Sequence, residues 1–152
     1  MNGDDSLPEV DAVSAYATGG GTKQGGSYQQ YIAKAEATRW SGWASAGKKV
    51  IPTVSAGWDN RPRAAAPLGY PCPWGVASGK YIDDPTMSEL ENHTLTGMEW
   101  VKANPAAAES NIMMLSAWNE HDEGHWIAPA LPKYGGTEKL EAIKRAIDRA
   151  AR

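Results

Sequence analysis

The chain has 152 residues, of which 41% are hydrophobic and 22% are charged, a composition typical of one globular domain. Its net charge of -3 and its 15 dispersed Lys and Arg residues, which form no basic stripe, disfavour a nucleic-acid partner. No apolar stretch approaches the length of a membrane span, and the acidic start Met1–Asp5 is unlike a secretory signal, so neither membrane insertion nor export is predicted and the compartment stays unknown.

The first predicted unit is a strand, a glycine-rich turn and a helix. A mixed apolar run predicts a strand over Glu9–Thr18, and Gly19–Gly26 then forms a turn. Apolar residues at helical spacing predict a helix over Ser27–Ala46, which Gly47 ends as a C-cap residue.

The second predicted unit contains the longest loop. β-Forming residues predict a strand over Lys49–Ala56, and a proline-rich loop follows over Gly57–Pro85. A connection of that length is usually functional in a compact domain, so residues 58–85 are expected to form an active-site loop. The single cysteine, Cys72, lies between two prolines and has no partner spacing for a disulfide or a metal, so it is expected to pack.

The third predicted unit follows a second helix. The capping-box spacing of Thr86 and Glu89 predicts the start of that helix, and Asn104–Pro105 ends it. A nearly all-apolar run predicts a buried strand over Asn111–Ala117. Amphipathic spacing predicts a last helix that begins near Thr137.

This alternation of strands and helices indicates an α/β fold with parallel strand pairing. Two architectures fit the alternation. One is a small doubly wound sheet, and the other is the C-terminal part of a TIM (β/α)8 barrel whose first strands lie outside this sequence. The sequence motifs distinguish the two better than the periodicity does.

An acidic segment, Trp118–His125, directly follows the third predicted strand. In parallel barrels the chemistry lies on loops at the carboxyl ends of strands, so Glu120 and Glu123 are the strongest catalytic candidates. One protonated carboxyl can act as an acid while an ionised neighbour acts as a base, because two close carboxylates resist ionising together. The alternative is a solvated acidic turn. The order of His121, Glu123 and His125 does not match a zinc-protease motif, and no metal is expected.

Two blocks of the chain resemble a known family. Residues Trp118–Gly124, followed by Trp126 and Pro129, are similar to the Trp/Phe-Asn-Glu-aromatic-x-Glu-Gly signature of glycoside hydrolase family 99-like barrels, which include the WbsX-type proteins of bacterial glycan clusters. Residues Pro52–Arg63 are similar to a strand-end segment of those proteins, in which Pro-Thr is followed by Gly-Trp-Asp and then Arg. The order and separation of the blocks suit that family's late barrel strands, so the resemblance covers residues 9–150.

The resemblance implies an enzyme built on a partial barrel. Residues 1–152 then form a single partial domain with about three of the eight β/α units. Exposed sheet edges need partners, so the missing N-terminal barrel half or a second copy is expected in addition to a carbohydrate substrate. The implied reaction is hydrolysis of O-glycosyl bonds with no cofactor. The rival interpretation is a non-catalytic carbohydrate-binding or scaffold fragment of a degenerate barrel.

The resemblance also implies roles for individual residues. Glu120 corresponds to a base that acts on the sugar's own 2-hydroxyl, and Glu123 to an acid that then serves as a base. Aromatic faces and polar groups are expected to bind the sugar ring and its hydroxyls. The implied substrate-binding residues are Trp58, Asp59, Arg61, Arg63, Trp118, Asn119, His121, His125 and Trp126.

Overall fold

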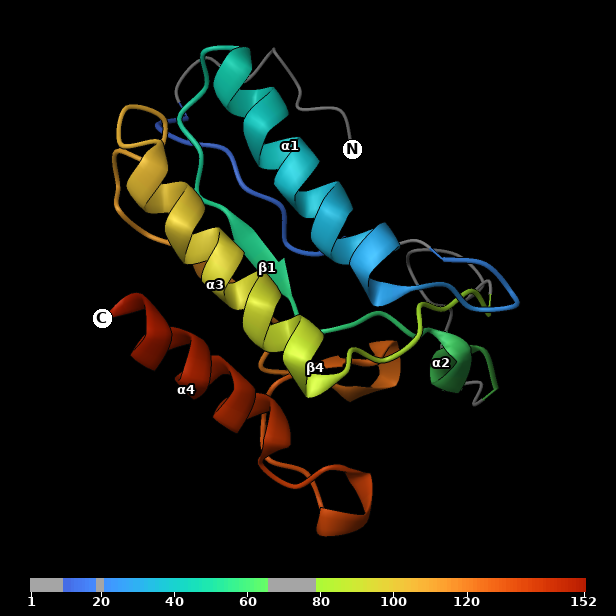
Figure 1. Ribbon diagram of the computed structural model, residues 1–152. Helices are drawn as coiled ribbons and strands as arrows, with labels where there is room; N and C mark the ends of the chain where they lie inside the picture. The colour runs from blue at the N-terminus through green and yellow to red at the C-terminus, as the bar shows by residue number, and fades with distance from the viewer. Residues whose placement is uncertain (1–9, 19–20, 66–78) are drawn as a thin grey trace.

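Helices make up most of the regular structure (Figure 1). The computed structural model describes residues 10–18, 21–65 and 79–152. The elements in chain order are η1 (Gln29–Ala33), α1 (Lys34–Ser45), β1 (Thr53–Ser55), α2 (Arg61–Ala65), α3 (Met87–Ala103), β2 (Met114–Ser116), β3 (Asn119–Glu120), η2 (His121–Glu123), β4 (His125–Trp126), η3 (Pro132–Tyr134) and α4 (Glu138–Ala150).

A short parallel sheet joins the second and third predicted strands. β1 pairs with β2 in parallel, with Thr53 opposite Met114. Both strands lie where the sequence predicts them, but both are shorter than predicted. The prediction that the later strand is buried is wrong for Met114 and Leu115, which are exposed because no further strand or helix covers them within the described residues. Pro52 has no N–H to donate, so regular pairing begins after it, although its carbonyl still accepts a hydrogen bond of 2.8 Å from the Met114 amide.

The prediction of a continuous first strand over Glu9–Thr18 is wrong for its described part. Residues 10–18 form one parallel bridge, between Val13 and Val50, rather than a strand. The next carbonyl of the ladder, that of Ile51, accepts a 2.7 Å hydrogen bond from the Ser14 hydroxyl. A side chain therefore takes a place that a backbone amide fills in a regular sheet.

The predicted helices are confirmed, with one irregularity. The first helix begins as a π-helical turn, η1, and continues as α1, and Gly47 follows it with a left-handed φ of 77°. Helix α3 has the predicted capping box, in which the Thr86 hydroxyl accepts from the Glu89 amide and the Glu89 carboxylate accepts from the Thr86 amide. The predicted last helix is α4, with Thr137 at its N-cap.

The main apolar core lies between β1 and the helices α1, α3 and α4. In Figure 1, α1 and α3 run along β1, and α4 lies beside α3. Burial of this apolar surface is the chief favourable contribution to folding. Its buried members are Trp40, Val50, Val54, Ala56, Leu90, Ile127, Ala142 and Ile143.

One edge of the parallel sheet is uncovered within the described residues. β2 pairs with β1 on one side, and Ile112, Met114 and Leu115 are exposed there. A groove of about 400 Å³ runs beside them between α3 and α4, and its lining includes Met98 and Ile147. An exposed strand edge with apolar side chains is a surface that proteins normally cover.

A buried ionisable network crosses the centre of the molecule. Glu36 of α1 lies 2.7 Å from the Nε2 atom of His93 of α3, and their side chains are 2% and 1% exposed. The Glu36 carboxylate also accepts hydrogen bonds from the Ser55 amide, at 3.1 Å, and from the Ser55 hydroxyl. The Tyr28 hydroxyl donates to the Ser55 carbonyl at 2.7 Å, and Trp40 stacks on the His93 ring with an interplanar angle of 4°. Polar groups of α1, β1 and α3 are thus satisfied by one another.

We expect Glu36→Gln to lower the free energy of unfolding by about 3 kcal/mol, because it breaks a buried pair and leaves His93 without its carboxylate. Urea denaturation measures this loss. Glu109→Gln is the matched control, because Glu109 pairs with Lys49 on the surface and its side chain is well exposed; it should change stability little. Equal effects of the two substitutions would contradict the central role given to Glu36.

Candidate active site

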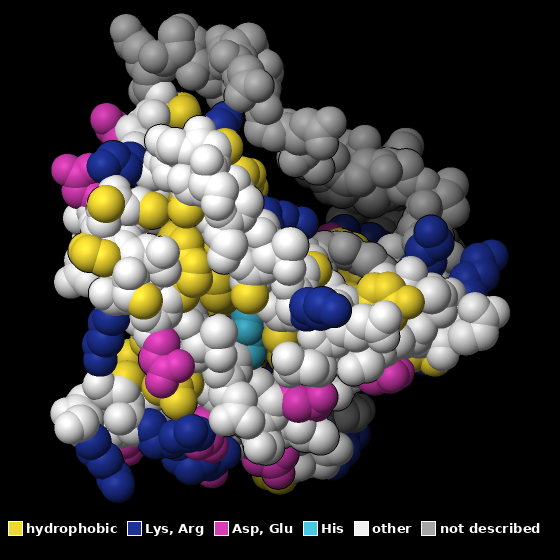
Figure 2. Space-filling view, turned by 45° about the horizontal axis from the view of Figure 1, so that its top comes forward, with side chains coloured by type: hydrophobic (Ala, Val, Ile, Leu, Met, Phe, Trp, Pro, Cys, Tyr) yellow, Lys and Arg dark blue, Asp and Glu magenta, His cyan; other side chains and the backbone are white. Residues whose placement is uncertain are grey.

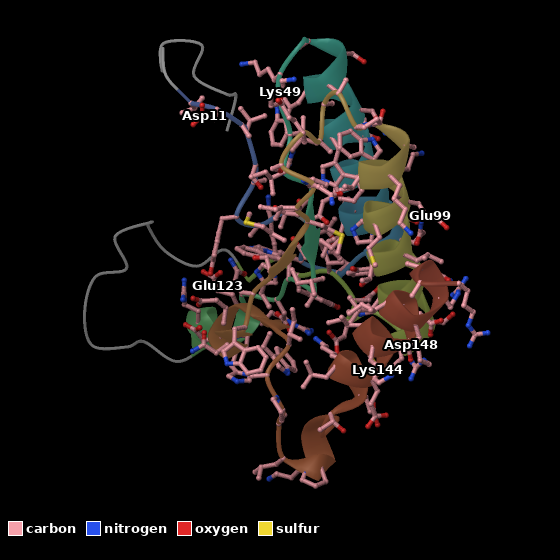
Figure 3. The ribbon with its side chains drawn as sticks, turned by 90° about the vertical axis from the view of Figure 1, so that its left-hand side faces the viewer. Asp11, Lys49, Glu99, Glu123, Lys144 and Asp148 are labelled. Carbon is pink, nitrogen blue, oxygen red and sulfur yellow. The ribbon has the colours of Figure 1, made fainter. Side chains whose placement is uncertain are left out.

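The two catalytic candidates lie on a tight hairpin just after β2. β3 and β4 pair antiparallel, with Asn119 opposite Trp126 and Glu120 opposite His125. The short helix η2 closes the hairpin, and Gly124 ends it in the left-handed region with φ of 59°. In Figure 3, Glu123 lies beside α2, far from Lys49 at the start of the second predicted strand. The candidates therefore lie at the end of the parallel strands where chemistry is expected.

The two sequence blocks that carry the family resemblance meet at this hairpin. The Asp59 amide donates a hydrogen bond to the Glu123 carbonyl. A β-carbon at Gly57 would lie 2.6 Å from the Gly124 carbonyl oxygen, and one at Gly124 would lie 2.5 Å from the β-carbon of Asp59. Both positions therefore require glycine for the close approach of the two chain segments.

Arg63 of α2 holds two carboxylates of the hairpin. Its guanidinium pairs with Asp122, at 2.7 Å, and with Glu123. Burial raises the pKa of Glu123 above its ordinary value; Arg63 opposes this shift, while Glu120 and Asp122 add to it. A raised pKa is the direction of shift that a general acid requires.

Asp59 and Arg61 are paired with each other. Three bonds of 2.7 to 3.1 Å join the guanidinium to the carboxylate, and the Arg61 amide also donates to Asp59. Burial by itself raises the pKa of Asp59, but the Arg61 hydrogen bonds outweigh it and lower that pKa overall. The guanidinium also lies 3.4 Å from the centre of the Tyr81 ring. Each of the two charges is therefore balanced by the other, and the Arg61 side chain stays about half exposed.

Tyr16 also lies in the site, although it is not among the site residues predicted from the sequence. Its hydroxyl donates a 3.3 Å hydrogen bond to Glu120, and its ring meets His125 edge-on. Burial, followed by the charges of Glu120 and Glu123, raises the pKa of Tyr16, so the phenol keeps the proton that it donates. A clue was available: Tyr16 lies near the carboxyl end of the first predicted strand, and the carboxyl ends of parallel strands share one edge.

The prediction that His125 binds substrate directly does not fit the structure, because its side chain is completely buried. Burial also lowers the pKa of His125, with the Ser116 backbone opposing the shift. The His125 side chain, although it belongs to the hairpin, therefore packs inside the protein. His121 is exposed, and its ring lies 5.4 Å from that of Trp126.

The three predicted sugar platforms differ in how much of each ring is free. Trp118 is 59% exposed, and its carbonyl is held by the amides of Ile127 and Ala128. Trp126 has the ammonium group of Lys139 over its ring, and Trp58 packs against a second core cluster around Tyr28 and Ile32. Trp118 is therefore the most exposed of these three residues. Asn119 beside it is also exposed.

Two other expectations concern metals and membranes. Among the side chains that the structure describes, no three His, Cys, Asp or Glu residues are grouped to hold a metal ion. Within the same residues, no helix is long and apolar enough to cross a bilayer. Lys and Arg side chains are scattered over the face drawn in Figure 2 rather than gathered into one patch. Cys72 and much of the predicted loop 58–85 lie outside the described residues.

Comparisons of the chain with protein-family models, curated proteins and solved structures gave no match. The resemblance of the two sequence blocks therefore remains a hypothesis.

We expect Gly124→Ala to destabilise the protein by at least about 1 kcal/mol more than Gly47→Ala. Both glycines have positive φ, but a β-carbon at Gly47 meets open space, whereas one at Gly124 collides with Asp59. Thermal or urea unfolding measures the loss of stability in each variant. Backbone strain from positive φ is common to both variants, so the difference between the two losses is the cost of the collision. Similar losses in both variants would show that the close approach is unimportant.

A second prediction concerns the titration of Glu123. Glu120→Gln should lower the pKa of Glu123 by removing a neighbouring negative charge, and Arg63→Met should raise it by removing an opposing positive one. Carboxyl ¹³C resonances followed against pH measure both shifts. Glu109→Gln, remote from the hairpin, should leave the titration unchanged. A rise in the pKa of Glu123 in Glu120→Gln, or a fall in Arg63→Met, would refute the charge arrangement described.

Proposed function

We propose that this chain carries the acid and base of a glycoside hydrolase, with Glu123 as the acid and Glu120 as the base. The observation that carries the proposal is the meeting of the Asp59 segment with the Glu120–Glu123 hairpin at the carboxyl ends of β1 and β2. The two carboxylates have different surroundings: Glu123 is partly buried and paired with Arg63, whereas Glu120 accepts from Tyr16. Such a difference supports separate acid and base roles.

The same site offers groups that suit a carbohydrate. Sugars present C–H faces that pack on aromatic rings and hydroxyls that need directional partners. Trp118 supplies an exposed ring, the next residue, Asn119, supplies an exposed amide, and the Asp59–Arg61 pair supplies further donors and acceptors. The proposed substrate is therefore a polysaccharide or glycan.

We further propose that the chain is the C-terminal part of a TIM barrel. The parallel neighbours follow chain order, since the Val13 segment lies beside the segment leading to β1, and β1 lies beside β2. Sequential order is that of a barrel, whereas a doubly wound sheet reverses direction at one point. The uncovered β2 edge supports a partner there, either the missing N-terminal half or a second copy.

One observation favours the rival function, a non-catalytic carbohydrate-binding fragment. Arg63 pairs with Glu123, so a sugar would have to compete with Arg63 for that carboxylate. In that case Trp118 carries the sugar binding and the glutamates serve to hold the hairpin.

We expect Glu123→Gln to lower turnover by about 10²-fold or more, the usual contribution of a general acid, while saccharide binding persists. The assay is release of reducing ends from a panel of oligosaccharides and polysaccharides, with binding followed by calorimetry. Asp148→Asn is the control, since Asp148 pairs with Lys144 on the surface of α4.

Trp118→Ala separates the two functions. It should weaken saccharide binding under either proposal. Binding that depends on Trp118 in a chain that cleaves nothing in the panel would establish the binding module and reject the hydrolase.

A further inference from the structure

Lys139 is the one buried residue among the charged residues of α4. It lies in the first turn of α4, and its side chain is 9% exposed. The other charged residues of this helix are exposed, namely Glu138, Glu141, Lys144, Arg145, Asp148 and Arg149. Lysine is rarely buried unless its ammonium group has partners. The position of Lys139 therefore calls for an explanation beyond packing.

The ammonium group contacts three separate segments at once. It donates to the Ala56 carbonyl, just after β1, at 3.1 Å, and to the Asp84 carboxylate, which precedes α3, at 3.1 Å. It also lies 3.9 Å from the ring centroid of Trp126 in β4. A desolvated cation over an indole face is a favourable contact. The Lys139 Nζ atom thus bridges the residue after β1 and the hairpin that carries Glu120 and Glu123.

Trp126, which contacts Lys139, belongs to the same hairpin as the Glu120 and Glu123 carboxylates. Trp126 is paired with Asn119, and the neighbouring pair is His125 with Glu120. Fixing the Trp126 ring against Lys139 therefore sets the distance between the hairpin and β1. The Asp59–Glu123 hydrogen bond fixes the other side of the same turn.

We propose that Lys139 is the positioning residue of the candidate active site, holding the hairpin of Glu120 and Glu123 against the end of β1 through Trp126. A role of Lys139 in catalysis rests on the proposed function, whereas its contact with Trp126 does not depend on that function. The charged group that faces the ammonium is Asp84, with His125 nearby on β4. Burial lowers the pKa of Lys139, and Asp84 opposes that shift. The ammonium consequently loses its proton at a lower pH than an ordinary lysine does.

The test uses the ¹⁵N-labelled full chain without any saccharide. Lys139→Met keeps the length of the side chain and removes its charge, whereas Lys139→Arg keeps a cation that can stack on Trp126. We expect Lys139→Met to shift the Trp126 indole resonance, assigned with Trp126→Phe, and to speed amide exchange over residues 119–126 by about tenfold relative to α1. Lys139→Arg should largely restore both, and Lys144→Met, on the same helix but exposed, should change neither.

The proposal would be overturned if Lys139→Met left the Trp126 resonance and the amide exchange of the hairpin unchanged. It would also be overturned if amide exchange became faster by the same factor in every element. If Lys139→Met does not fold, a pH titration of His121→Gln decides, because the His121 ring also lies against Trp126. The Trp126 indole must still report a transition below the ordinary lysine range in that variant, and its absence overturns the proposal. Because no saccharide is used, lack of hydrolysis in the panel rejects the hydrolase without affecting this result. If hydrolysis is found, Lys139→Met should lower kcat more than it alters KM.

Discussion

A single buried carboxylate, that of Glu36, fixes how the first helix, the parallel sheet and the second long helix meet. It is hydrogen-bonded to Ser55 of β1 and to His93 of α3, and Trp40 and Tyr28 close over the group. Removing a carboxylate from water is costly, and the cost is offset only when every partner is in place. The network therefore permits one relative placement of α1, β1 and α3. Because Ser55 is the last residue of β1, the same network sets where the Gly57–Asp59 segment begins.

The site depends on that starting point. Asp59 reaches the Glu123 carbonyl only if the end of β1 is fixed, and the glycines at 57 and 124 allow the two segments to touch. Charges then complete the arrangement in pairs: Arg61 with Asp59, Arg63 with Asp122 and Glu123, and Lys139 with Asp84. Since each of these cations already has a carboxylate partner, their attraction for an anionic ligand is weak.

Local signals explain which features the sequence predicted. Helices α3 and α4 follow from capping and from apolar spacing, both of which act within a few residues. The strands were placed correctly where apolar runs are uninterrupted, but Ser14 diverts a ladder bond and Pro52 cannot donate one. Burial of His125, the covering of Trp126 by Lys139 and the entry of Tyr16 all arise from contacts between distant segments, which periodicity does not encode. Likewise, the acidic segment pointed to Glu120 and Glu123, but its fold as a hairpin and its ion pairs depend on contacts with distant residues.

The contact between Gly57 and Gly124 has a consequence for how this protein can change over time. Neither position has room for a side chain, so a bulkier residue on one loop must be matched by a retreat of the other. The residues that can be accepted on one loop therefore depend on the conformation of the other. A directed-evolution library that randomises residues 57–63 alone should be dominated by misfolded variants, whereas one that varies residues 119–126 at the same time should retain more folded members.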